Sequence, residues 1–134
     1  GLTPVIISDK VEWVTPEEWR SQGERFKGEL EAWRRDWESL DNERYLRHYS
    51  RNFSANDQDF DAFSAYKRQV HAGKSALQVK ISDISLFQYP GKDNLIVVTF
   101  TQDYRSSNLN NVMKKRQYWQ LENSQWRIIY EGAA

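Results

Sequence analysis

The sequence predicts an α+β domain, with three helices followed by a bent four-stranded antiparallel sheet. Up to Gly73 apolar residues recur at the spacing of helices, and after it they alternate in the two-residue period of strands. Helices and strands that are segregated along a chain favour a sheet with the helices packed on one face. At 134 residues and 16.0 kDa the chain suits one domain and buries roughly two-thirds of its surface on folding. A core can therefore form without disulfides, and the sequence contains no cysteine.

The first predicted helix has a clear start signal. Thr15 is a candidate N-cap, Pro16 suits the first helical position, and Glu18 completes a capping box. Residues 1–14 are interpreted as an extended lead-in, the end of a linker with too few turn signals for a separate domain, and residues 15–134 as the domain itself. An apolar stripe then marks one face of a long helix through Trp19, Phe26, Leu30, Trp33, Trp37 and Leu40.

Two further helices are expected before the sheet. Asp41 begins the second, and its buried side carries Tyr45, Leu46 and Tyr49. The third ends near Gly73, and its apolar run consists of Phe60, Phe63, Tyr66, Lys67 and Val70. Both helices therefore have an apolar face to pack against the sheet.

Four strands follow in an antiparallel meander, separated by turns at 89–94, 106–111 and 122–125. In the first strand the apolar alternation changes phase at Ser82 and Asp83, which predicts a β-bulge and a sharp bend. A bent sheet wrapped against helices leaves a cone-shaped space between the two layers.

Strand pairing assigns the side chains of the sheet to two faces. In the second hairpin, pairing Ser106 with Asn111 places Asp103 opposite Lys114 on a solvated outer face. We therefore expect the alternate residues of these strands to form the inner face.

The last hairpin is expected to pair Leu121 with Trp126. With regular alternation, this pairing sets Tyr130 beside Gln117 on the inner face and turns Glu131 outward. The outward carboxylate would then belong to the surface and not to a site.

The inner face is apolar at one end and polar at the other. Its closed end is expected to be filled by Ile96, Trp119, Trp126 and Ile128. The open end forms the predicted ligand pocket, lined by Gln102, Tyr104, Lys115, Gln117 and Tyr130 and roofed by Tyr45, Tyr49 and Phe53. An apolar cavity with a few convergent polar groups is the usual form of a ligand site. The alternative is that these groups hydrogen-bond one another at the sheet margin while Lys115 extends to water.

No motif for catalysis, for a cofactor or for a metal is recognisable. The 19 basic and 19 acidic side chains cancel, which argues against a nucleic-acid partner. No apolar run approaches the ~20 residues of a membrane span. His48 and His71 lack metal-ligand spacing, and Asp83 is the one strand carboxylate whose direction stays open. We therefore expect no catalytic residue, no cofactor and no metal.

Four segments together carry a resemblance to a known family: WVTPEEW (13–19), EAWRRDWESLDNERYLRHYSRNF (31–53), ISLFQYPGKDNLIVVTFTQDYRS (84–106) and KRQYWQLENSQWRIIYEG (115–132). They resemble the nuclear transport factor 2-like (SnoaL-like) accessory domain found at the C-terminus of proteobacterial L,D-transpeptidase-family (YkuD-type) proteins, which act on the peptidoglycan of the cell wall. The resemblance implies a cone-shaped fold, a periplasmic location and a catalytic domain of the same polypeptide as partner. That catalytic domain uses a cysteine nucleophile, which this chain lacks.

Three functions are open at this point. The first is a non-catalytic binding or positioning domain that holds a peptidoglycan fragment, a peptide or the partner domain against the enzyme. The second is a small isomerase or dehydratase, as some relatives of this scaffold are, with Tyr104 as acid and Asp83, or another acidic residue turned inward, as base. The third is a dimerisation module, a homodimer whose outer sheet face buries Tyr118, Arg116 and Ile129 between chains.

Overall fold

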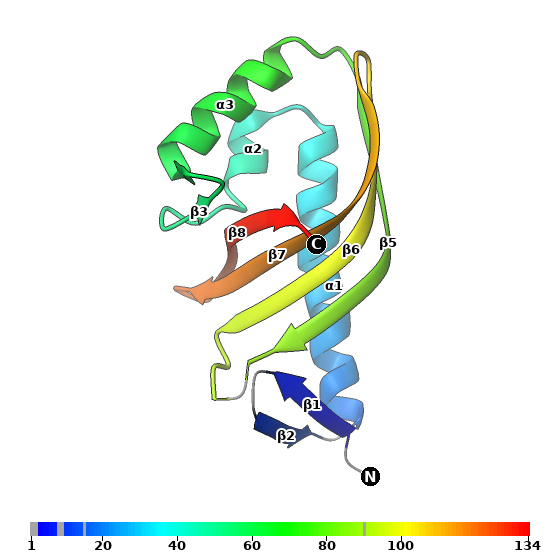
Figure 1. The fold of residues 1–134 in the computed structure, drawn as a ribbon, viewed down its shortest axis with the longest axis vertical. Coiled ribbons are helices and arrows are strands. Elements are labelled where there is room, and N and C mark those ends of the chain that lie inside the picture. Colours follow the sequence, from blue (N-terminus) through cyan, green and yellow to red (C-terminus); the bar gives the residue numbers. More distant parts are fainter. Residues whose placement is uncertain (1–2, 8–9, 15, 90) are drawn as a thin grey trace.

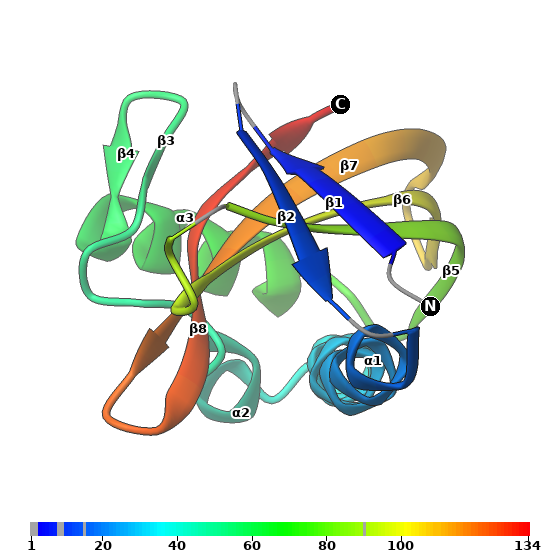
Figure 2. The same ribbon diagram turned by 90° about the horizontal axis from the view of Figure 1, so that it is seen from below.

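The computed structural model describes residues 3–7, 10–14, 16–89 and 91–134, and side chains for 23–89 and 91–134. Helices precede the main sheet, as predicted: α1 (Pro16–Glu38), α2 (Asn42–Leu46) and α3 (Phe60–Ala72). The sheet is an antiparallel meander in the order β5 (Leu77–Gln88), β6 (Leu95–Ser106), β7 (Asn110–Glu122) and β8 (Gln125–Ala133). Its long strands curve, with α2 and α3 beside one end of α1 (Figure 1). All of the described helices lie on one side of this sheet, and its opposite face carries none (Figure 2).

Two small hairpins accompany the main sheet, and neither was expected. The lead-in is itself a hairpin of β1 (Thr3–Ile7) and β2 (Lys10–Val14), and β1 contacts β5. The segment before α3 forms a second, short hairpin of β3 (Ser54–Ala55) and β4 (Gln58–Asp59). Each of these strands has at most five residues, too few for a period to show in the sequence.

The three helices form in the predicted segments, but α2 ends at Leu46, so Tyr49, which was predicted on its buried side, follows the helix. Helix α1 begins at Pro16, whereas the predicted N-cap Thr15 lies outside the described residues. The Asp41 side chain accepts a hydrogen bond from the Arg44 backbone N–H at 3.2 Å and caps α2. Helix α3 ends at Ala72, just before Gly73. Among the side chains of α1 that the structure describes, those of Phe26, Leu30, Trp33 and Trp37 are buried, whereas Trp19 of the predicted stripe lies outside the described side chains.

Helix α1 is fixed to the edge strand of the sheet by polar contacts. The Arg34 guanidinium donates to the Val79 carbonyl at 3.1 Å, and the Val79 N–H donates to the Glu38 carboxylate at 2.8 Å. Because the N–H and the carbonyl group of Val79 both face α1, these contacts fix the position of the helix along β5.

The bulge predicted in β5 is present, and it settles the direction of Asp83. The β5–β6 register shifts between Ser82 and Ser85, and Asp83 has a φ of 53°. Asp83 is exposed and accepts a hydrogen bond from the Thr101 hydroxyl at 3.4 Å. It therefore lies on the outer face of the sheet.

The β6–β7 hairpin has the predicted faces, but its register differs by two residues. Asp103 pairs with Val112 and not with Lys114. The reason is the turn, because the Ser106 hydroxyl accepts hydrogen bonds from the N–H groups of both Asn108 and Leu109. The turn therefore closes on Leu109, two residues before the predicted Asn111.

The β7–β8 hairpin contains a bulge that the sequence analysis missed. Trp119 pairs with Ile128 as predicted, but a register shift follows and leaves Ile129 without a partner. Beyond it Tyr130 pairs with Tyr118 on the outer face, and Glu131 pairs with Gln117 on the inner face. The predicted inward direction of Tyr130 and outward direction of Glu131 are therefore both wrong.

The closed end of the core is filled by aromatic rings from both layers. Trp119 and Ile128 are fully buried, while Ile96 and Trp126 are half-buried against them. The Phe26 ring of α1 packs edge-on against the rings of Trp119 and Trp126, with centroids 5.2 and 5.8 Å away.

Within the described part of the chain, no helix is long and apolar enough to cross a membrane.

Candidate ligand-binding site

The polar end of the inner sheet face is buried beneath the helices. Seven of the eight residues predicted for the pocket meet there, each less than 10% exposed: Gln102, Tyr104, Lys115, Gln117, Tyr45, Tyr49 and Phe53. The eighth, Tyr130, packs against Tyr118 on the other face of the sheet, with ring centroids 5.0 Å apart. A Cβ at Gly132 would come within 2.5 Å of the Tyr130 hydroxyl, so glycine leaves room for that ring.

A buried carboxylate is the centre of this polar cluster. Glu131 accepts hydrogen bonds from the Tyr49 hydroxyl and the Gln117 amide, both at 2.8 Å. The Lys115 ammonium lies 3.7 Å from the other carboxylate oxygen. The Gln117 carbonyl in turn accepts from the Trp119 indole at 3.0 Å. Strand β8 thus places an ionised acceptor among three donors.

The Tyr49 hydroxyl connects this carboxylate to the helices. It accepts from the Trp33 indole at 3.1 Å and lies 3.0 Å from the Tyr45 hydroxyl. Because its single proton is donated to Glu131, Tyr45 must be the donor in the tyrosine pair. Burial, followed by the charge of Glu131, raises the pKa of both tyrosines well above the ordinary value.

The charged groups of the cluster shift one another's pKa values. Burial raises the pKa of Glu131, but Lys115, Lys67 and the two hydrogen bonds outweigh it and leave that pKa below its ordinary value. Burial also lowers the pKa of Lys115, and the attraction of Glu131 offsets only part of this effect. Glu131 is therefore an ionised, fully engaged carboxylate, which is a poor general base.

A cavity of about 240 Å³ opens above this cluster, between α3, the β3–β4 hairpin and the ends of β7 and β8. Its floor includes Lys115 and Glu131, and Phe53 and Phe63 form an apolar wall. Lys67 of α3 stands at the side, its ammonium 5.2 Å from the Trp37 ring. The cavity therefore combines aromatic walls with a cationic group.

Lys67 differs from Lys115 in having no counterion. Among the side chains that the structure describes, no carboxylate lies within ion-pair distance of its ammonium. Burial lowers the pKa of Lys67 to about 8, and repulsion from Lys115 adds to this more than Glu131 offsets. The side-chain carbonyl oxygen of Gln102 is buried with no hydrogen-bond donor among the described residues.

The acid–base pair considered for an enzyme does not assemble. Tyr104 is buried on the inner face, with its ring 5.3 Å from that of Trp37, whereas Asp83 lies on the outer face. The sheet therefore separates the two groups.

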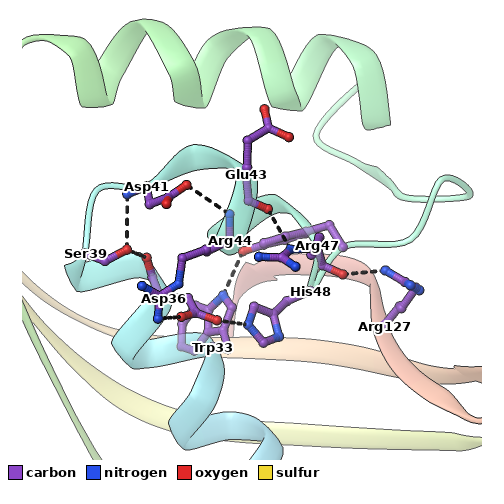
Figure 3. Close-up of polar contacts among 10 residues, drawn as sticks. Trp33, Asp36, Ser39, Asp41, Glu43, Arg44, Arg47, His48 and Arg127 are labelled. Atoms are coloured by element: carbon purple, nitrogen blue, oxygen red, sulfur yellow. Dashed lines mark hydrogen bonds and ion pairs between the residues drawn. The ribbon is translucent and has the colours of Figure 1, made fainter.

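Both histidines have structural hydrogen bonds. His71 accepts from the Trp37 indole at 3.2 Å, and its other ring nitrogen lies 2.7 Å from the Asn42 side-chain oxygen. Burial, with repulsion from Lys67 and Lys74, lowers the pKa of His71 to about 4. His48 binds the Asp36 carboxylate at 2.7 Å, next to Arg44 (Figure 3). No group of three potential metal ligands occurs among the described residues.

Sequence reasoning missed two residues of the site. Glu131 was assigned outward because regular alternation was assumed, although the adjacent pair Ile128 and Ile129 interrupts that alternation. Lys67 was assigned to the apolar run of α3 because aromatic residues flank it, so its positive charge was not considered as part of a site. In each case a break in an apolar pattern was the available signal.

A family model described as the Cds6 C-terminal NTF2-like domain, where NTF2 is nuclear transport factor 2, matches residues 25–132. A comparison with curated proteins finds no match.

Solved structures share this fold. Bd1075 of Bdellovibrio bacteriovorus is 24% identical with a TM-score of 0.83, and the alignment covers 98% of this chain and 48% of that protein. Pgp2 of Campylobacter jejuni, a helical cell shape determining protein, is 25% identical with a TM-score of 0.66 over 77% of this chain and 38% of that protein. An NTF2-like protein of unknown function from Pseudomonas putida KT2440 is 12% identical with a TM-score of 0.70, covering 84% of both chains.

The chain thus spans less than half the length of Bd1075 and of Pgp2. The matched residues include α2, α3, most of α1 and nearly all of the main sheet. The fold and the match together lead to one conclusion: this chain belongs to the Cds6 C-terminal NTF2-like domain family.

Proposed function

We propose that this chain is a non-catalytic binding and positioning domain whose cavity accepts a carboxylate-bearing ligand. The observation that carries the proposal is Lys67, a cation without a counterion beside an aromatic-walled cavity. A ligand carboxylate at this position would supply the missing charge, and burial from water would strengthen the pairing.

The ligand class we propose is a peptidoglycan fragment or a related peptide. Its stem peptides carry carboxylates, and its sugars can pack against aromatic rings. Membership of the Cds6 C-terminal family and the likeness to Pgp2, a cell shape determining protein, support this setting. The parent protein would then be a periplasmic L,D-transpeptidase-type protein, with its catalytic domain, in the same polypeptide, as the partner of this chain.

The site favours binding over catalysis. Glu131 is ionised and already accepts hydrogen bonds from two side chains, and the tyrosines beside it hold their protons tightly. With Asp83 on the outer face and Glu131 already hydrogen-bonded, the described residues that line the cavity include no free carboxylate to act as a base.

The test is a titration of the ¹⁵N-labelled chain with a purified disaccharide tetrapeptide, followed by NMR. We expect saturable shifts at the amides of Ala55, Lys67 and Gly132, and at least tenfold weaker binding in Lys67→Gln. Affinity should fall about tenfold per pH unit above pH 8, because the ligand requires the protonated form of Lys67, whose pKa is about 8.

The matched control is Lys80→Gln, which removes the same charge from an exposed position of β5. It should bind as the unmodified chain does, and a fragment with amidated carboxylates should bind poorly to both. Equal weakening by the two substitutions, or no saturable shift with the fragment, would overturn the proposal.

A further inference from the structure

A larger depression lies outside the cavity, where the segment after α2 meets the start of α3 and the β7–β8 turn. It has a volume of about 580 Å³, and its lining includes four arginines: Arg47, Arg51, Arg68 and Arg127. We call it the arginine groove. A neighbouring depression of about 430 Å³ shares Arg47, Gln125 and Arg127 with it, so the two adjoin where those residues meet.

The floor of the arginine groove is fixed by backbone hydrogen bonds. Ser50 donates its N–H to the Ile128 carbonyl, and the Ile128 N–H donates to the His48 carbonyl, each at 2.8 Å. The Ser50 side chain is fully buried, donates to Glu122 at 2.9 Å and accepts from the Asn52 N–H at 2.9 Å. The groove is therefore preorganised, which lowers the entropic cost of binding.

Three of the four arginines have no carboxylate partner among the described side chains. Arg68 pairs with Glu43 at 2.7 Å, but no carboxylate among the described side chains lies within ion-pair distance of Arg47, Arg51 or Arg127. Arg127 is oriented by the Arg47 carbonyl, as Figure 3 shows, and by the Gln125 side chain. The Arg51 guanidinium lies 4.7 Å from the centre of the Phe60 ring.

A guanidinium has five N–H donors in a planar fork, so one or two orienting contacts leave several of them for a ligand. Carboxylates match this fork with two parallel hydrogen bonds. The stacking of Arg51 on Phe60 and the anchoring of Arg127 hold both forks in place, so an arriving carboxylate meets a defined geometry.

We propose that the arginine groove binds an acidic peptide segment of a partner protein. The side-chain amides of Asn52, Asn123 and Gln125 line the same groove and suit the N–H and C=O groups of an extended peptide. Peptide carboxylates recur at alternate positions on one side of an extended chain, a spacing of about 7 Å. One extended segment can therefore present more than one carboxylate to the groove.

A long polyanion fits the same surface poorly. The chain has no net charge, so it exerts no overall attraction on a nucleic acid. Glu43, Asp61 and Glu122 also line the groove and would repel a continuous row of phosphates. A short segment needs only a few carboxylates, and these can face the arginines instead of the three acidic residues.

The experiment is an NMR titration of the whole chain with N-acetylated tetraglutamate, using tetraglutamine as the uncharged comparison. We expect submillimolar binding of tetraglutamate alone, weakened by salt, with shifts at the amides of Asn52, Asn123 and Arg127. Arg51→Gln should weaken binding at least fivefold, and Arg51→Lys should restore less than half of that loss because lysine has no fork.

Two controls separate this proposal from the ligand cavity. Lys67→Gln and Lys80→Gln should each leave tetraglutamate binding unchanged, since neither side chain lines the groove. Arg127→Gln serves as a second groove variant, read only if its spectrum remains that of the folded chain. The proposal is overturned if tetraglutamate shifts nothing in the groove, if inorganic phosphate competes at equal concentration, or if the disaccharide tetrapeptide binds there more tightly.

Discussion

Glu131 and Lys115 form an ion pair that is shielded from water. Removing two charges from water is costly, and their attraction and hydrogen bonds must offset that cost. Glu131 has two side-chain donors besides Lys115, whereas Lys115 relies on Glu131 and the rings of Trp33 and Trp37, 5.7 and 4.9 Å from its ammonium. The lysine is therefore the more dependent partner.

The substitution Glu131→Gln tests this dependence. Glutamine keeps the shape and an acceptor oxygen but leaves the buried ammonium without a counterion. We expect a loss of about 3 kcal/mol in the free energy of unfolding, measured by urea denaturation. The double variant Glu131→Gln with Lys115→Met should recover at least half of that loss. A single variant within 1 kcal/mol of the unmodified chain, on the order of an ordinary substitution, would show that the pair is not coupled in this way.

At the scale of single residues, the sequence predicted which strands carry the polar residues of the site better than it predicted the face to which each side chain points. Gln102, Tyr104, Lys115 and Gln117 reached the inner face because alternation is regular along the middle of β6 and β7. Tyr130 and Glu131 exchanged faces because one extra residue reverses every side chain beyond it. The bulge arises from pairing with β7, and its one sign in the sequence is the adjacent apolar pair Ile128 and Ile129.

The bulge at Ile129 is the element that builds the site. It allows one strand to place Ile128 and Glu131, an odd number of positions apart, on the same inner face. Without it the carboxylate would face solvent and the Tyr130 ring would enter the polar cluster.

Deletion of Ile129 is therefore expected to be far more damaging than its truncation. The deletion restores regular alternation, exposes the carboxylate and leaves Lys115 unpaired, so we expect a loss above about 3 kcal/mol or failure to fold. Ile129→Ala keeps the register and should cost about 1 kcal/mol, because the side chain is only half-buried. Circular dichroism during thermal unfolding measures both. Similar midpoints for the two variants would contradict the role given to the bulge.

The elements themselves were predictable where their causes are local. The cap at Asp41 and the stop before Gly73 depend on neighbours within four positions. Register in the β6–β7 hairpin depended on one hydroxyl, that of Ser106, which can cap turns of more than one length. The turn residues show that a loop is present. They do not show which two residues close it, because Ser106 could form similar hydrogen bonds in turns of different length.

The whole molecule should lose stability in mild acid. His71 has a folded pKa of about 4 against an ordinary value of 6.5, so the unfolded chain binds its proton first as the pH falls. Stability from this residue is complete above pH 6.5 and is lost as the pH falls toward 4, by up to about 3 kcal/mol. Glu131, whose pKa is lowered, adds a further loss below pH 4.5.

Urea unfolding at a series of pH values from 7 to 4 measures this dependence. His71→Gln should be less stable at pH 7, because it disturbs the contacts to Trp37 and Asn42, yet its stability should change less between pH 6.5 and 4.5. The interpretation fails if the variant and the unmodified chain have parallel pH profiles.

For the molecule as a whole, the change of period at Gly73 was enough to predict the class and the order of helices and strands. That the polar end of the inner sheet face is enclosed was harder to predict from the sequence. It depends on α3 and the β3–β4 hairpin lying around the same cavity as β7 and β8, which are far from them in the sequence.

The aromatic packing of the closed end also has a consequence for biogenesis. Phe26 and Trp33 of α1 are covered by Trp119 and Phe100, so α1 is made long before its covering strands. At synthesis rates of about 5–20 residues per second, the interval between Phe26 and Trp119 lasts roughly 5–20 seconds. Throughout that interval an emerging chain displays an aromatic stripe with no sheet to cover it. Exposed apolar surface of this kind on an incomplete chain is what chaperones protect from aggregation.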